Sequence, residues 1–349
     1  MTLKNKSTIE HTQKSYGVRR EALEFPLMCV ISFSYVCNAA CPNCPYTNSR
    51  IRSNYADRPF ITEETFKIIS DQCGEYDAWV RISGGGEPML HPKAVELIEY
   101  TKQVGARVGL ITNGSRFTEE SISRLLEAQV DMIEFSVDAA DPETYALVRK
   151  GLNWERLLKN VKRMVALRNK LKSKTKIIAS GVNQVGVDIE KVATFWDGIV
   201  DDFQIRKYLT WGINDPARSA DPIPYLPPEK LIPCPFIFER LNIDSRGRVM
   251  VCGFDIAGVT NLGNVHERSI KDIWRGPEFE EYRQRHLKGR GREIDLCKNC
   301  TDWKYRSWQH NYWKVLHNAE RRRKDRFKKS NIRDLEGCIS QTGETEQAE

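Results

Sequence analysis

Three cysteines lie within eight residues of this chain, in the stretch Cys37-Asn38-Ala39-Ala40-Cys41-Pro42-Asn43-Cys44. Thiolates are the usual protein ligands of iron–sulfur clusters, and a [4Fe–4S] cluster takes four ligands. This C-x3-C-x2-C loop would supply three, leaving one iron open to a small molecule with its own donor atoms. A structural zinc site needs four closed ligands, and no histidine or fourth cysteine lies nearby. The spacing therefore favours a cluster over zinc.

A glycine-rich segment, Gly84-Gly85-Gly86-Glu87-Pro88, follows an apolar run at 78–83. Glycines let a main chain approach a ligand closely because no Cβ stands in the way. Alone, such a segment is more often a turn. At the end of a predicted strand, and in one chain with the cysteine loop, it resembles the signature of the radical S-adenosyl-L-methionine (SAM) enzymes.

This resemblance implies a [4Fe–4S] cluster on Cys37, Cys41 and Cys44 whose open iron chelates the amino and carboxylate groups of SAM. In that family, electron transfer into the sulfonium releases a 5′-deoxyadenosyl radical, which takes a hydrogen atom from the substrate. The resemblance also implies an electron donor such as a flavodoxin or ferredoxin.

The same resemblance implies which residues bind SAM. Gly85, Gly86, Glu87 and Pro88 are expected to hold the methionine amino group, Asn113 to lie on the same rim, and Ser136 and Arg149 to bind the carboxylate and ribose. Arg149 could equally be a solvated residue at a helix end. Asn43 stands where most members carry an aromatic residue near the adenine, so Tyr46 is the expected substitute.

Apolar runs alternate with amphipathic stretches along the first two thirds of the chain. Strands are predicted near 29–36, 78–83, 107–112, 131–138, 175–182 and 202–208, and helices near 62–73, 91–103, 118–128, 154–170 and 188–197. This alternation favours a parallel sheet of βαβ units, and the family resemblance makes it an α/β fold with a partial (β/α)6 TIM barrel. Active sites of such barrels gather at the carboxyl ends of the strands.

A second cysteine set lies beyond the predicted barrel. Twelve residues separate Cys234 from Gly247, four more separate Gly247 from Cys252, and Cys297-Lys298-Asn299-Cys300 follows. The runs at 241–244 and 248–251 predict a hairpin with Gly247 at a turn position of positive φ. The set resembles the SPASM/twitch extension of radical SAM enzymes, which implies one auxiliary [4Fe–4S] cluster. A four-cysteine zinc ribbon is the structural alternative.

These motifs divide the chain into an N-terminal extension (1–28), a radical SAM partial barrel (29–225), a small SPASM/twitch iron–sulfur domain (226–310) and a C-terminal helix with a basic tail (311–349). The net charge of +7 comes mostly from the run Arg321 to Lys329. Such a run can bind nucleic acid. No RNA-binding motif accompanies it, so we expect a solvated tail and no nucleic-acid partner.

The chain has no apolar stretch long enough for a membrane span, and its first twenty residues do not read as a signal peptide. Ten cysteines in such a chain indicate metal ligands rather than disulfides. A reducing cytoplasmic location is therefore expected.

The motifs from Asn261 to Cys300 resemble members that modify sugars and aminoglycosides, among them the dehydrogenase that acts on 2-deoxy-scyllo-inosamine. This implies a small-molecule polyhydroxylated substrate, for which two-electron alcohol dehydrogenation is favoured. Epimerisation is an alternative that needs a thiol donor. Cys29 and Cys73 are not expected at the rim, and Cys338 lies in the tail, from which it could fold back but is more often idle. Peptide modification is another, although only 28 residues precede the first predicted strand. A non-enzymatic iron–sulfur or zinc nucleic-acid-binding protein is the remote alternative, and no catalytic base stands out.

Overall fold

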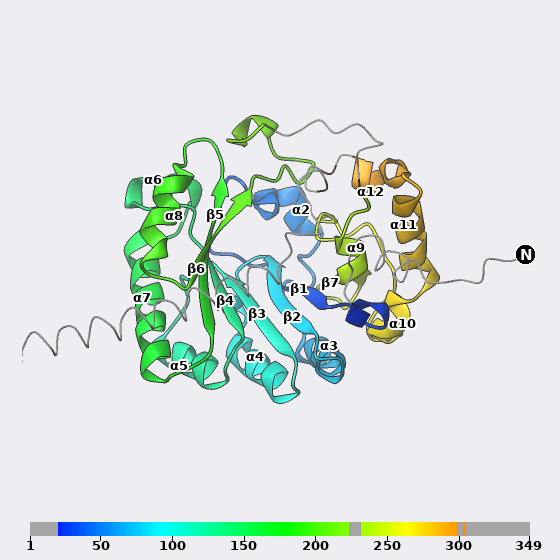
Figure 1. The fold of residues 1–349 in the computed structure, drawn as a ribbon, viewed down its shortest axis with the longest axis horizontal. Coiled ribbons are helices and arrows are strands. Elements are labelled where there is room, and N and C mark those ends of the chain that lie inside the picture. Colours follow the sequence, from blue (N-terminus) through cyan, green and yellow to red (C-terminus); the bar gives the residue numbers. More distant parts are fainter. Residues whose placement is uncertain (1–19, 223–231, 299, 301–302, 304–349) are drawn as a thin grey trace, which may run out of the picture.

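One sheet organises the molecule (Figure 1). The computed structural model describes residues 20–222, 232–298, 300 and 303. Its eight strands have the order β6-β5-β4-β3-β2-β1-β7-β8. From β1 to β6, each strand pairs in parallel with its neighbour in sequence. Because β6 and β8 are the two edges, the barrel is open, and the predicted partial (β/α)6 barrel is confirmed.

The six predicted barrel strands all form, with ends within two residues of those expected. They are β1 (Met28–Ser34), β2 (Trp79–Gly85), β3 (Arg107–Thr112), β4 (Met132–Ser136), β5 (Lys176–Asn183) and β6 (Asp202–Lys207). The SPASM/twitch region adds β7 (Arg240–Ile243) and β8 (Val249–Met250).

The five predicted helices correspond to α3 (Glu63–Glu75), α4 (Ala94–Gln103), α5 (Glu119–Glu127), α7 (Trp154–Lys170) and α8 (Ile189–Asp197). Polar side chains fix where several begin: Thr62 caps α3 by accepting the N–H of Thr65. The structure adds α2 (Ser49–Ser53), α6 (Pro142–Val148), α9 (Phe236–Glu239), α10 (Ile270–Trp274), α11 (Pro277–Leu287) and α12 (Asp295–Lys298). Short 3-10 helices are η1 (Arg20–Leu23), η2 (Pro45–Thr47), η3 (Pro88–Leu90), η4 (Pro216–Arg218) and η6 (Gly291–Glu293).

Helix α6 was missing from the predicted elements. It has seven residues, too few to establish a clear apolar period, so the polar residues around it dominate the sequence pattern. Its start is fixed locally, because the side chain of Asp141 accepts the N–H of Thr144 and Pro142 occupies the first turn. The helix ends at Arg149, which matters for the site below.

Alternate residues of the strands face two different cores. On β1, Cys29, Ile31 and Phe33 belong to the large core that the helices cover on the outer side of the sheet (Figure 1). On the inner side, Met28 packs with Trp79, Met132 and Ile178 in a separate small cluster. All four lie at or near the amino ends of their strands, so this cluster closes the base of the barrel and leaves the carboxyl ends to polar residues.

The predicted hairpin forms, with β7 and β8 antiparallel and Gly247 at a φ of 79°. An unexpected feature is that β7 also pairs in parallel with β1, from Met28↔Arg240 to Ile31↔Ile243. The second cysteine region therefore continues the barrel sheet, and Figure 1 shows α9 to α12 gathered beside β7. The sequence of the hairpin contains a signal for its turn, at Gly247, but no signal that β7 pairs with β1.

The segment after the first cysteine loop is tied to the hairpin. The Oγ of Ser245 donates to the carbonyl of Arg58 at 2.6 Å, and the hydroxyl of Tyr55 donates to the carbonyl of Ile256 at 3.1 Å. Arg246 forms an ion pair with Asp57. These bonds fix the first cysteine loop relative to the second cysteine region. No helix in the described ranges has the length and apolar character needed to cross a membrane.

Candidate functional site

The first cysteine loop starts just after β1, at the carboxyl edge of the sheet. Cys41 is buried, Cys37 and Cys44 are half-buried, and all three thiols are free. The backbone turns tightly, with the N–H of Cys44 donating to the carbonyl of Cys41 at 3.0 Å. The N–H of Ala40 donates to the carbonyl of Lys150 at 2.8 Å, which ties the loop to the end of α6.

Asn38 connects this loop to the end of β3. Its Nδ2 donates to the Oγ of Ser115 at 2.9 Å, and its Oδ1 accepts from the Nδ2 of Asn113 at 3.1 Å. Asn113, predicted for the SAM site, is thus brought against the cysteine loop. The sequence predicts no role for Asn38, because an amide inside a cysteine loop has no pattern that identifies its partner.

The glycine segment also lies against the cysteine loop. Gly85 has a φ of 70° and pairs with Ser34 at the end of β1. A Cβ at Gly86 would lie 2.1 Å from the carbonyl oxygen of Val36. The N–H of Glu87 donates to that same oxygen at 2.9 Å. Position 86 therefore requires glycine because the main chain there lies directly against the segment that leads into the cysteine loop.

Gly86→Ala is expected to lower the free energy of unfolding by about 1–3 kcal/mol, because the added methyl group meets backbone that cannot move aside easily. It should weaken SAM binding as well, since relieving the clash separates the glycine segment from the cysteine loop. Gly198→Ala is the matched control, since a Cβ there meets nothing within 4 Å. Urea unfolding and SAM titration of both variants test this, and wild-type values for Gly86→Ala would contradict it.

The carboxylate of Glu87 is buried and braces the end of β3. Its Oε1 accepts from the Oγ1 of Thr112 at 2.6 Å and from the N–H of Met89 at 3.1 Å, while its Oε2 accepts from the N–H of Asn113 at 2.7 Å. Burial raises the pKa of Glu87, and these three donors oppose that shift. Glu87 therefore fixes the rim between β2 and β3.

Arg149 points into the site. Its Nη2 lies 2.8 Å from the Oδ2 of Asp138, and its Nη1 donates to the Sγ of Cys41 at 3.8 Å. Its side chain is only 14% exposed, so the alternative of a solvated helix-end arginine is wrong. Burial by itself would lower the pKa of Arg149, but Asp138 and Cys41 raise it above its ordinary value. The guanidinium therefore stays charged beside the cysteine loop.

Asp138 is itself held in place by its neighbours. It is fully buried, has a φ of 55°, and accepts the N–H of Val182 at 2.8 Å through its Oδ1. Asp138 is the last residue of the strand predicted near 131–138, and no role was predicted for it. A signal was present, because an acid just past a buried strand in a parallel sheet lies at the rim where a buried arginine needs a partner.

Burial raises the pKa of the Cys37 thiol and raises that of Cys44 to about 11, while the charge of Arg149 opposes both shifts. Free thiols with raised pKa values are protonated near neutral pH. Because iron binds thiolates, cluster assembly on this loop must release these protons.

Two further predicted residues occupy different surroundings. Ser136 ends β4, is half-buried and lies in register with Ser180 of β5, so it faces the same rim. Tyr46 packs in an aromatic cluster, with ring centroids 5.7 Å from Tyr35 and 6.4 Å from Tyr55. The structure thus gives the Tyr46 ring protein partners beside Cys44.

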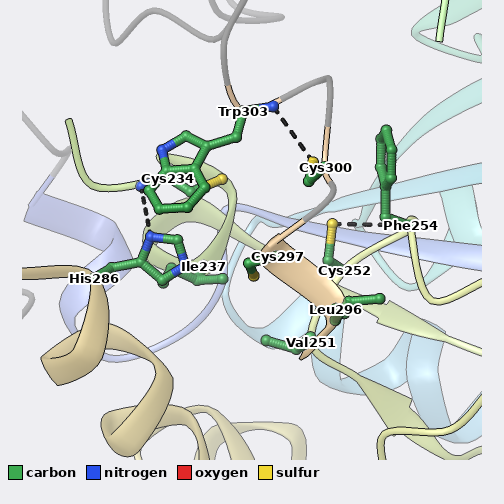
Figure 2. Close-up of a pocket in the computed structure, with 10 residues that line it drawn as sticks. All are labelled: Cys234, Ile237, Val251, Cys252, Phe254, His286, Leu296, Cys297, Cys300 and Trp303. Atoms are coloured by element: carbon green, nitrogen blue, oxygen red, sulfur yellow. Dashed lines mark hydrogen bonds between the residues drawn. The ribbon is translucent and has the colours of Figure 1, made fainter. Parts of the chain in front are cut away.

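The four cysteines of the second set line one pocket (Figure 2). Cys234 and Cys252 are buried, while Cys297 and Cys300 belong to the turn at α12. The remaining lining is Ile237, Val251, Phe254, His286, Leu296 and Trp303. Backbone N–H groups point at two sulfurs, from Phe254 to Cys252 at 3.5 Å and from Trp303 to Cys300 at 3.4 Å. Such N–H···S contacts are among the features that tune iron–sulfur clusters.

The four thiols of this pocket match the donor set of an auxiliary cluster. A structural zinc ion would need four ligands, with sulfurs about 2.3 Å from it. A four-iron cluster spreads its ligands over separate irons. Four cysteines that line an apolar pocket therefore fit an auxiliary cluster, and four thiols are also the donor set of the zinc alternative.

The loop after β6 runs between the two cysteine regions. The Nδ2 of Asn214 donates to the carbonyl of Asn43 at 2.9 Å, beside Cys44. Trp211, which has a φ of 52°, stacks on Phe254 of the second pocket with ring centroids 4.9 Å apart. One loop thus contacts the walls of both cysteine sites.

A buried charged cluster on the inner face of the barrel was also missed. Glu134 of β4 lies between Arg206, at 2.5 Å, and Arg81, at 3.8 Å. The signal was an acid within the otherwise apolar run of β4, at an alternate position that faces inward with Ser136. These charges place polar groups inside the barrel below the rim.

Comparison with known proteins agrees with this architecture. Residues 31–194 match the radical SAM superfamily, and residues 234–301 match the SPASM iron–sulfur cluster-binding domain. The chain therefore contains a radical SAM domain followed by a SPASM domain. A curated relative is the PqqA peptide cyclase of Granulibacter bethesdensis, which is 24% identical over 75% of this chain and 78% of its own.

Two solved structures share the fold. BtrN in complex with AdoMet and 2-DOIA has a TM-score of 0.54 at 19% identity, covering 78% of this chain and 92% of its own. Streptococcus suis SuiB bound to the precursor peptide SuiA has a TM-score of 0.62 at 15% identity, covering 85% and 73%. Both similarities confirm the fold. The two structures differ in what they were solved with, which is 2-DOIA for BtrN and a precursor peptide for SuiB.

Proposed function

We propose that this radical SAM/SPASM enzyme oxidises a secondary alcohol of a sugar or an aminocyclitol to a ketone, removing two electrons. The observation that carries the proposal is the second pocket, which four cysteines line together with mostly apolar side chains. Four thiolates would leave no iron open for substrate. The natural role of a cluster closed in this way is to accept an electron.

In this proposal Cys37, Cys41 and Cys44 hold the radical SAM cluster, and Cys234, Cys252, Cys297 and Cys300 hold the auxiliary cluster. When bound, the first cluster and SAM supply the 5′-deoxyadenosyl radical that takes a hydrogen atom from the substrate carbon. The barrel over 29–225 provides the first site and the domain over 226–310 the second.

The residues of the rim orient SAM. The segment Gly85-Gly86-Glu87-Pro88 binds the methionine amino group, with the Glu87 carboxylate kept in place by Thr112 and Asn113. Arg149 and Ser136 bind the carboxylate and ribose, and Tyr46 contacts the adenine. Asp138 acts through Arg149, because it fixes the guanidinium beside Cys41.

Electron counting links the two sites. Loss of a hydrogen atom from a carbinol carbon leaves a radical that holds one electron and one hydroxyl proton more than the ketone. The proton must pass to a base, and the electron must pass to an acceptor. Accepting that electron is the chemistry that the auxiliary cluster would supply. A flavodoxin or ferredoxin would deliver the electron that starts each cycle.

The other described cysteines support oxidation over epimerisation. An epimerase of this kind needs a thiol that returns a hydrogen atom to the opposite face of the substrate. Cys29 and Cys73 are fully buried in the core on the helix-covered side of the sheet. Cys338, the remaining possibility, lies outside the described residues. Neither Cys29 nor Cys73 can reach a substrate at the rim.

Peptide modification is the second candidate, because a peptide cyclase is among the relatives and SuiB has been solved with a precursor peptide. The two candidates differ in the substrate that stimulates SAM cleavage. The small polyol is favoured by the resemblance of the second cysteine region to the aminocyclitol dehydrogenase.

Anaerobically reconstituted protein with dithionite and SAM is expected to form 5′-deoxyadenosine above the blank. A panel of aminocyclitols and aminosugars should contain a substrate that yields one ketone per SAM consumed. Stimulation by a peptide alone, with a cross-linked peptide product, would support the second candidate and reject the first. No 5′-deoxyadenosine with any substrate would contradict both.

A further inference from the structure

A histidine lines the second pocket together with the four cysteines. His286 comes from the last turn of α11 and is 2% exposed. Its Nδ1 accepts the backbone N–H of Cys234 at 3.3 Å, as the dashed line in Figure 2 shows. It therefore fixes the backbone at one cysteine while its ring faces a lining that is otherwise apolar or sulfur-bearing.

That hydrogen bond determines the form of the imidazole. A ring nitrogen that accepts a hydrogen bond carries no proton, so a neutral His286 has its proton on Nε2. The Nε2 atom is buried. Apart from the imidazole itself, the side-chain acceptors among the residues that line this pocket are the sulfurs of Cys234, Cys252, Cys297 and Cys300.

The ring is held in place by its neighbours. Its centroid lies 4.4 Å from that of Trp303, whose Nε1 donates to the carbonyl of Ile232 at 2.6 Å. A Cβ at Gly291 would lie 2.2 Å from the Trp303 ring and 3.0 Å from the His286 ring. Glycine at 291 therefore allows the two rings to stack against η6, and the imidazole is pre-positioned before a cluster is assembled.

We infer that His286 is a positioning residue of the auxiliary site, whose Nε2–H donates a hydrogen bond to a sulfur of the cluster that the four cysteines hold. The inference rests on the proposed function, in that it requires a cluster at this site. A donor to sulfur stabilises the reduced, more negative state, so it raises the reduction potential. His286 thereby makes the auxiliary cluster a better acceptor for the electron that leaves the substrate.

Two substitutions separate the donor from the backbone contact. Asn at 286 can place an acceptor near the position of Nδ1 and so keep the bond to Cys234, but it has no group at the position of Nε2. Gln reaches further and can place an amide N–H there. The background for both is the full chain with Cys37, Cys41 and Cys44 replaced by alanine, so that the auxiliary cluster alone gives a signal.

The measurement is a redox titration of the reconstituted protein, followed by electron paramagnetic resonance. His286→Asn is expected to lower the equilibrium constant for reduction at least about ten-fold, which is 59 mV for one electron, while His286→Gln stays near the parent value. His91→Leu is the control, because buried His91 also accepts a backbone N–H, from Lys93 at 3.1 Å, but lies outside this pocket. It should leave the potential unchanged.

Equal potentials in the Asn, Gln and parent proteins would overturn the inference while leaving the cluster, and the proposed function, intact. Zinc and no paramagnetic signal in the parent itself would instead overturn the proposed function at this site. If His286→Asn fails to retain iron, pulsed electron paramagnetic resonance of the parent protein decides: hyperfine coupling of the reduced cluster to an imidazole N–H supports the donor, and its absence contradicts it.

Discussion

Replacing Cys297 and Cys300 together by alanine is expected to abolish ketone formation while SAM cleavage continues at a reduced rate. These two residues supply half of the thiols that line the second pocket. Without them the auxiliary cluster cannot be closed, and the substrate radical loses its electron acceptor. The first cysteine loop is built on β1 and the glycine segment, so the SAM site remains. Ketone and 5′-deoxyadenosine are quantified together by mass spectrometry.

Cys73→Ala is the matched control for the double variant. It also removes a buried thiol, but from α3 in the core on the helix-covered side of the sheet, outside the second pocket. It should form ketone and 5′-deoxyadenosine in the wild-type ratio, apart from any loss of stability. Ketone formation at the wild-type rate by the Cys297/Cys300 variant would show that the second pocket does not accept the electron.

The second large effect concerns the first cysteine loop. Reconstituted wild type should bind about eight irons per chain, and the variant with Cys37, Cys41 and Cys44 replaced by alanine about four, given two four-iron clusters. In this variant 5′-deoxyadenosine should fall to the blank, because no cluster remains to bind SAM. Iron and zinc are measured by elemental analysis. If one zinc per chain persists after the triple substitution, the second pocket holds zinc and the predicted auxiliary cluster is wrong.

The sequence could predict the barrel and the order of its motifs because the signals are local. Each strand has its own apolar run, and the cysteine loop and glycine segment follow their strands directly. The hairpin was predictable for the same reason, since Gly247 marks its turn. The cysteine spacing indicated a second site, and the structure brings those four residues to one pocket.

What could not be predicted depends on contacts between distant segments. The pairing of β7 with β1 has no sequence signal, because any buried strand with a free edge could accept β1. The same holds for the bond of Asn38 to Asn113, the ion pair of Arg149 with Asp138, and the imidazole of His286 beside Cys234. A sequence shows that such groups need partners once buried, but only the fold selects which partner each receives.

The central claim is that the protein oxidises an alcohol by radical SAM chemistry. It is tested most directly by running the reaction in D2O with the substrate found in the panel and measuring the molecular mass of the product by mass spectrometry. The expected product is a ketone two mass units below the substrate, once exchangeable deuterium, including any on the carbons beside the carbonyl, has been returned to hydrogen. A product that gains one solvent deuterium on carbon, with inverted configuration at that centre, would contradict it, since that outcome requires a hydrogen-atom donor and no net loss of electrons.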